Sequence, residues 1–178
     1  MTKIINIIQA LNFLYIFEIL NADKEELLSV LDTDYLDEEG ESIIYEDFSS
    51  YEVQLFLINF YSEEINRGVT NEFLVSFLKE NGVNDIQIEG EEEKLYTCSC
   101  CGYNTLADRY EYSICRVCFW EDSGDYELDS NQHSSCNHMS IKTGRMNFKK
   151  FGACSERSLE FVDPLGKEKF KQEIEFSV

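Results

Sequence analysis

The chain has 178 residues, 43% of them apolar, and it includes 13 phenylalanines and 10 tyrosines. This composition is that of a globular protein and excludes a disordered acidic polymer. Residues 1–95 carry 5 basic and 22 acidic side chains, a net charge of −17, whereas residues 96–178 carry 10 and 13, a net charge of −3. The total of −20 repels phosphate backbones, which disfavours nucleic acid as a partner.

The negative charge of residues 1–95 has two interpretations. It can act only to keep the protein in solution. It can also speed the encounter with a basic protein, because opposite charges steer association. The second interpretation names the partner class that we expect, a basic protein rather than a nucleic acid or a membrane.

The N-terminal stretch is apolar but is interrupted by Asn6, Gln9 and Asn12. It is too short and too polar to span a bilayer, and no small-residue cleavage site follows, so we expect a cytoplasmic protein. Helical spacing of the apolar residues predicts an amphipathic helix over residues 4–20. Its buried stripe would contain Ile4, Ile8, Leu11, Tyr15 and Ile19.

Two further helices are predicted on either side of an acidic connection. Asn21 or Asp23 can cap the first, which carries Leu27, Leu28 and Leu31. Residues 32–50 are rich in carboxylates, but their glycine and glutamate do not fall where a calcium loop needs them, so we expect a solvated connection. The next helix, over residues 51–66, is apolar nearly all round and is predicted to lie centrally, with Gly68 as its stop.

A fourth helix follows Thr70, its expected cap, and ends at Asn81-Gly82. Its inward side chains would be Phe73, Leu74, Phe77 and Leu78. Residues 86–88 alternate like a strand, and residues 90–94 have the charge and glycine of a linker.

Two Cys-x-x-Cys pairs, Cys98/Cys101 and Cys115/Cys118, are separated by thirteen residues. Zinc prefers four soft ligands in a tetrahedron, and two such turns supply them, so we predict one structural Zn²⁺ held by these four cysteines. Gly102 suits the exit of the first turn, which often needs a positive φ. The alternatives are a redox Cys-x-x-Cys pair and buried thiols without metal.

The residues after the second pair are aromatic and then acidic. Phe119 and Trp120 are expected to pack over the cysteines, the alternative being an exposed recognition surface. The acidic stretch, with Glu121, Asp122, Asp125, Glu127 and Asp129, is expected to be a solvated loop.

Ser140 can cap a helix over residues 141–151 that ends at Gly152. One face of that helix, expected to lie against the ribbon, carries Ile141, Gly144, Phe148 and Phe151. The basic side chains Lys142, Arg145, Lys149 and Lys150 are read as a solvated face, with nucleic-acid binding as the weaker alternative. Beyond Pro164, a last strand or short helix is expected.

The remaining cysteines and histidines are ambiguous. Cys100 is expected to point away from the metal, and Cys154 to be a small buried hydrophobic side chain. Cys136 and His138 stand close in sequence and could join Cys100 or Cys154 in a second metal site. With seven cysteines, an odd number, a secreted disulfide framework is disfavoured.

Four blocks of the second half, residues 98–106, 112–122, 137–140 and 147–154, resemble the bacterial cysteine-rich CPCC family over roughly residues 96–165. Ser99 stands where the family has the proline of its name, which loosens the turn without removing a ligand. The resemblance implies a zinc-ribbon-like module. Because some members occur in polymorphic toxin loci as immunity-type proteins, it also implies such a role.

These observations predict an α+β protein with an acidic helical domain over residues 1–90, a linker at 91–95 and a zinc-ribbon domain with an appended helix over 96–178. No metalloprotease helix, nucleophile elbow or phosphate loop is present in the sequence, so we expect no enzyme. We expect instead an inhibitor that binds and neutralises a basic, nuclease-type toxin. The alternative is a zinc-ribbon adaptor in transcription or RNA metabolism.

Overall fold

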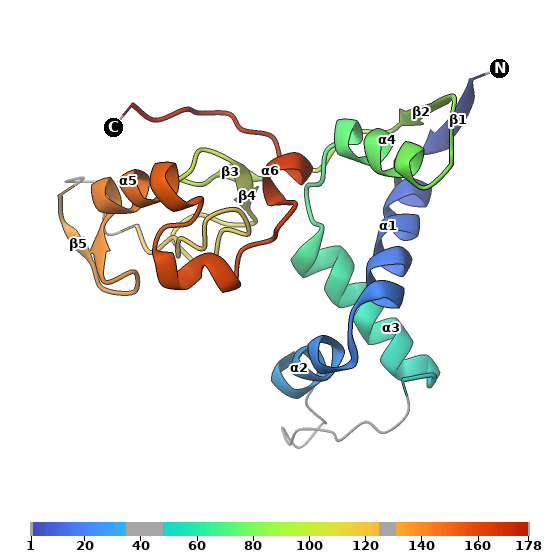
Figure 1. Ribbon diagram of the computed structural model, residues 1–178, viewed down its shortest axis with the longest axis horizontal. Coiled ribbons are helices and arrows are strands. Elements are labelled where there is room, and N and C mark those ends of the chain that lie inside the picture. The colour runs from blue at the N-terminus through green and yellow to red at the C-terminus, as the bar shows by residue number, and fades with distance from the viewer. Residues whose placement is uncertain (1, 35–47, 125–130, 178) are drawn as a thin grey trace. The chain divides into compact units, whose positions relative to one another are not determined.

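The computed structural model describes residues 2–34, 48–124 and 131–177 (Figure 1). The chain divides into two compact units. The first contains Met1–Arg67 and Leu74–Glu91, and the second contains Gly68–Phe73 and Glu92–Val178. Helices and short sheets are both present, as the predicted α+β class requires.

The first unit contains most of the helical structure. Its elements are β1 (Lys3–Asn6), α1 (Ile7–Asn21), α2 (Lys24–Asp34), α3 (Tyr51–Phe60), the π-helical turn η1 (Tyr61–Ile65), α4 (Asn71–Glu80) and β2 (Ile86–Glu89), with the first turn of α4 grouped in the second unit. β1 and β2 pair in parallel, from Lys3 opposite Ile86 to Asn6 opposite Glu89. The strand predicted at residues 86–88 is therefore confirmed.

The helix predicted over residues 4–20 is wrong at its start. Asn6 ends β1 and caps α1: its Oδ1 accepts a hydrogen bond from Ile8 N at 2.9 Å, and its own N–H donates to Gln9 Oε1 at 3.3 Å. This reciprocal pair is a capping box, which starts the helix at Ile7. Ile4 and Ile8 are consequently 66% and 65% exposed instead of buried.

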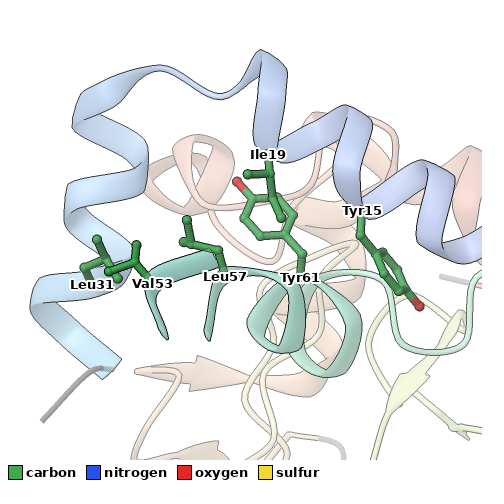
Figure 2. Packing of buried hydrophobic residues seen from close by; sticks show 6 residues of the cluster. All are labelled: Tyr15, Ile19, Leu31, Val53, Leu57 and Tyr61. Carbon is green, nitrogen blue, oxygen red and sulfur yellow. The ribbon is translucent and has the colours of Figure 1, made fainter. Parts of the chain in front are cut away.

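A cluster of buried side chains joins three helices of the first unit (Figure 2). Its members are Tyr15 and Ile19 of α1, Leu31 of α2, Val53 and Leu57 of α3, and Tyr61 of η1. Asp23 is the cap of α2, since its Oδ1 accepts from Glu26 N at 2.8 Å. α2 extends to Asp34, so the predicted connection does not begin at Asp32, and residues 35–47 lie outside the described part of the chain.

The helix predicted over residues 51–66 consists of α3 and η1. Asn66 N donates to Tyr61 O at 2.9 Å, the i to i+5 bond of a π-turn. The predicted burial all round is wrong, because Tyr51 is 74% exposed and only one face of α3 enters the cluster. α4 follows the prediction: Thr70 Oγ1 accepts from Phe73 N at 3.2 Å, and its four predicted inward residues are buried.

The second unit has little regular structure. Its elements are β3 (Tyr96–Thr97), β4 (Asn104–Leu106), β5 (His133–Ser134), β6 (Met139–Ser140), α5 (Ile141–Phe151), the 3₁₀ turn η2 (Glu156–Glu160) and α6 (Gly166–Lys169). β3 pairs with β4, and β5 with β6, both antiparallel. α5 is confirmed with both its caps: Ser140 Oγ accepts from Thr143 N at 3.2 Å, and Gly152 is left-handed with φ +90°.

No helix among the described residues has the length and apolar character needed to cross a membrane.

Candidate metal centre

The first cysteine pair lies in a tight turn between β3 and β4, called here the first knuckle (residues 98–102). Cys98 N donates to Tyr103 O at 2.8 Å, and Gly102 N donates to Cys98 O at 2.9 Å. Gly102 has φ +81°, which confirms the predicted need for a glycine at the exit of the turn.

The second pair repeats this path in the second knuckle (residues 115–119). Cys115 N donates to Trp120 O at 2.9 Å, and Phe119 N donates to Cys115 O at 2.8 Å. Phe119 takes the place of Gly102 with φ +63°, a conformation uncommon for a residue with a side chain. The spacing of cysteines predicts two equivalent turns, but nothing local in the sequence marks Phe119 as left-handed.

The two knuckles bring the four predicted ligands together. The sulfur atoms of Cys98, Cys101, Cys115 and Cys118 all lie within 4.8 Å of one another, and all four residues are buried. Cys98 Sγ and Cys118 Sγ are 3.7 Å apart, and Cys101 Sγ and Cys115 Sγ are 3.5 Å apart. A tetrahedral zinc site with Zn–S bonds of about 2.3 Å has S–S edges of about 3.8 Å. The donor set and its dimensions therefore fit a four-thiolate metal ion.

The neighbours of the four thiols favour charge on Cys115. Burial raises the pKa of Cys98, Cys101 and Cys118. Burial also acts to raise the pKa of Cys115, but hydrogen bonds from the other thiols and from Thr105 Oγ1, at 3.0 Å, hold it well below its usual range. Thr105 thus supplies a donor to one ligand sulfur, a role that its position on β4 does not reveal from sequence alone.

A family model described as "Cysteine-rich CPCC" matches residues 96–169. This segment is a cysteine-rich CPCC domain. The resemblance seen in the sequence is confirmed, and residues 1–95 lie outside the match. No curated protein and no solved structure matches the chain.

Of the two aromatic residues predicted to pack over the cysteines, Trp120 is fully buried and Phe119 is half-buried. A Cβ atom on Gly144 of α5 would stand 2.9 Å from Trp120 Cζ3 and 3.3 Å from Cys100 Sγ, so the absence of a side chain at Gly144 lets α5 approach the second knuckle. Phe119 stacks on Phe161, with ring centroids 5.1 Å apart.

Asp122 is not the solvated side chain that the sequence predicted. It is fully buried, and its Oδ2 accepts from Arg109 Nε at 3.0 Å and from Tyr110 N at 3.1 Å. The pair fixes the loop after β4, where Tyr110 is left-handed with φ +67°. The prediction failed because the partner, Arg109, is thirteen residues away. Of the other predicted loop residues, Asp125, Glu127 and Asp129 lie outside the described residues.

Arg145 is a second correction. The sequence predicts that it lies on a solvated basic face of α5, but its Nε donates to the carbonyl of Ser99 in the first knuckle at 3.0 Å. The helix therefore holds the loop between the first two cysteines by a charged donor.

The structure does not assemble the suggested second metal site. Among the described residues, the one group that could hold an ion consists of Cys98, Cys101, Cys115 and Cys118. Cys100 and Cys154 are buried outside it, and Cys136 Sγ lies 3.3 Å from Ser134 Oγ and 3.2 Å from Asn137 Nδ2.

The backbone of Cys154 braces the second knuckle. Cys154 N donates to Cys118 O at 2.7 Å, and Cys154 Sγ donates to Phe119 O at 3.3 Å. Burial raises the pKa of this thiol to about 11, so it stays protonated as a donor at neutral pH.

Proposed function

We propose that the CPCC domain holds one zinc ion as a structural centre, with Cys98, Cys101, Cys115 and Cys118 as its ligands. The sulfur tetrahedron described above carries this proposal. Four protein ligands close the zinc shell, whereas a catalytic zinc keeps a position open for water. The protein is therefore proposed to be a binding protein and not an enzyme.

The bound ion would supply folding free energy to a domain that has little regular secondary structure. Its strands are two or three residues long, and segments this short cannot form an independently stable sheet. Linking two turns through one ion fixes both knuckles at once, which orients Trp120 and α5 around them.

Metal analysis tests the zinc proposal. Protein purified without chelator should contain about one zinc per chain, and cobalt substitution should give the absorption of a tetrahedral thiolate site. Protein free of metal that keeps its folded structure, or an octahedral cobalt spectrum, would contradict it.

For the whole protein, we propose that the acidic first unit binds a basic protein, and that this partner is a nuclease-type toxin that the chain neutralises. The proposal rests on the net charge of −17 over residues 1–95 and on the CPCC resemblance. A nuclease cleft is positive because it holds phosphate, so a negative surface can both find it quickly and block it. Exposed carboxylates suited to this include Glu25, Glu52 and Glu80.

Co-expression is the decisive test of the partner. The reading frame immediately upstream is expressed in a bacterial host alone and together with this protein; killing that this protein relieves supports an inhibitor. Absence of killing, combined with salt-sensitive binding of the purified protein to RNA or DNA, would favour the zinc-ribbon adaptor instead.

A matched set of variants tests the electrostatic part of the proposal. Replacing Glu25, Glu52 and Glu80 by glutamine should slow association with the toxin and flatten its salt dependence. The control set replaces three exposed carboxylates of the CPCC domain, Glu111, Glu156 and Glu160, and should leave the association rate unchanged. Equal effects of the two sets would refute a role specific to the first unit.

A further inference from the structure

The last part of the chain, Lys171–Phe176, runs in an extended conformation beside the first knuckle, and we call it the strap. It begins beyond residue 169, where the family match ends. Asn104 N of β4 donates to Lys171 O at 2.9 Å, and Tyr103 and Gln172 form an antiparallel bridge. The strap thus adds a third chain segment to the hairpin that carries the first cysteine pair (Figure 1).

Further hydrogen bonds from the strap end on the knuckle itself. Gln172 Nε2 donates to the carbonyl of the ligand residue Cys101 at 3.1 Å. Glu173 N and Ile174 N both donate to Gly102 O, at 2.8 Å and 3.2 Å. These two carbonyls belong to the left-handed exit of the turn, so the strap fixes the part of the knuckle that must stay bent for Cys101 to face the other three sulfurs.

The strap also lies in close steric contact with the knuckle. A Cβ atom on Gly102 would stand 1.7 Å from Ile174 O, a distance that no relaxed structure allows. Gly102 is therefore required twice, for its φ and for the approach of the strap. At the far end, the Arg145 guanidinium lies 3.8 Å from the ring centroid of Phe176 while its Nε holds Ser99 O. Arg145 joins strap, α5 and knuckle.

A recess in the CPCC domain is bordered by these same three elements. It is lined by Cys100 and Cys101 of the knuckle, Arg145 and Phe148 of α5, and Gln172 and Phe176 of the strap. Removing the strap would take away one side of this recess, whose lining includes the ligand residue Cys101.

The two knuckles are thus braced at equivalent atoms by different parts of the chain. In the second knuckle, Cys154 donates to the carbonyl of Cys118 and to that of the left-handed residue Phe119. In the first knuckle, the strap donates to the same two carbonyls, those of Cys101 and Gly102. Cys154 lies inside the family match, and the strap lies outside it.

We propose that the strap is a positioning element that holds the first knuckle closed and sets how fast the metal ion leaves the CPCC domain. The proposal rests on the structural zinc proposed above. Groups that orient metal ligands without touching the metal typically change metal affinity about 10- to 100-fold when removed.

Zinc transfer to a chromophoric chelator, 4-(2-pyridylazo)resorcinol, tests the proposal. A protein that ends at Phe170 should release zinc about 10- to 100-fold faster than the full chain. The matched control is the full-length variant Lys171→Ala: this exposed side chain pairs with Glu173 at 2.8 Å, and its removal leaves the backbone bonds of the strap in place. It should release zinc at the wild-type rate.

Point variants keep the test decisive if the shortened protein does not fold. Arg145→Ala with Phe176→Ala, in the full chain, should speed release by a smaller factor than truncation. Gly102→Ala should speed release more in the full chain, where it also collides with the strap, than in the shortened chain. Equal release rates of the full-length, truncated and Arg145/Phe176 variants would overturn the strap while leaving the zinc proposal intact. A full-length protein that binds no zinc would refute the zinc proposal itself.

Discussion

The two units of this chain are stabilised internally by different interactions. In the first, aliphatic and aromatic side chains of three helices meet in one cluster around Val53 and Leu57, and removal of apolar surface from water stabilises it. In the second, the residues buried between two short turns are cysteines, and their side chains converge on a point suited to a cation. One unit should therefore fail when its apolar side chains are cut, and the other when its ion is removed.

The largest effect is expected from loss of two ligands. Cys98→Ser together with Cys118→Ser should unfold the CPCC domain, because zinc supplies about 10–16 kcal/mol of apparent binding free energy in small zinc domains. Trp120, the single tryptophan, is buried beside the site and should shift its emission to the red. The helical circular dichroism of the first unit should persist. A double variant with wild-type emission and stability would contradict the metal centre.

A substitution in the apolar cluster should destabilise the first unit and leave the metal centre of the CPCC domain unchanged. Leu57→Ala removes a fully buried side chain from the cluster and should lower the free energy of unfolding of the first unit by about 2–5 kcal/mol. Its zinc content should remain that of the wild type. Leu20→Ala is the control, since Leu20 is 77% exposed and its truncation should cost little. Denaturant titration followed by circular dichroism, with metal analysis of the same samples, measures both.

The stability of the first unit should fall at alkaline pH because of Tyr61. Burial, and then the nearby carboxylate of Glu26, raise the pKa of Tyr61 above that of a free tyrosine. Because the folded state favours the neutral phenol, the resulting stability is complete below the unfolded pKa of about 10 and is lost as pH rises toward the folded value. Tyr61→Phe removes the hydrogen bond to Glu26, at a cost of about 0.5–1.5 kcal/mol at neutral pH, and should flatten this alkaline loss. An unchanged slope in Tyr61→Phe would assign the loss to another group.

The smallest effect is expected at Cys136. Its sulfur lies among Ser134 and Asn137 and outside the four-cysteine group, so Cys136→Ala should leave one zinc per chain and the emission of Trp120 unchanged. A fall in zinc content would show that Cys136 is a metal ligand.

The predictions that succeeded rest on short sequence motifs. The two Cys-x-x-Cys pairs, the glycine at 102, and the caps Ser140 and Gly152 each act over a few residues, so the sequence displays them directly. The helix over 141–151 and the grouping of the four ligands could be predicted for this reason.

Non-local partners explain the failures. Ile4 lies in a strand because β2, about eighty residues later, pairs with it in parallel. Asp122 is buried with Arg109 as its partner, and Arg145 is half-buried and donates to the carbonyl of Ser99. Periodicity and charge predict which face of a helix or strand is apolar or polar. They do not predict which distant residue pairs with a given side chain.

The positions of the braces along the chain have a consequence for biosynthesis. The ribosome makes proteins from the N-terminus, so the fourth ligand, Cys118, is synthesised well before Cys154 and before the strap that begins at Lys171. A nascent chain can thus present a complete set of thiols while both knuckles are still unbraced and their sulfurs are accessible. The retention proposed for the strap would therefore begin only after Lys171–Phe176 has been synthesised, later than the four cysteines.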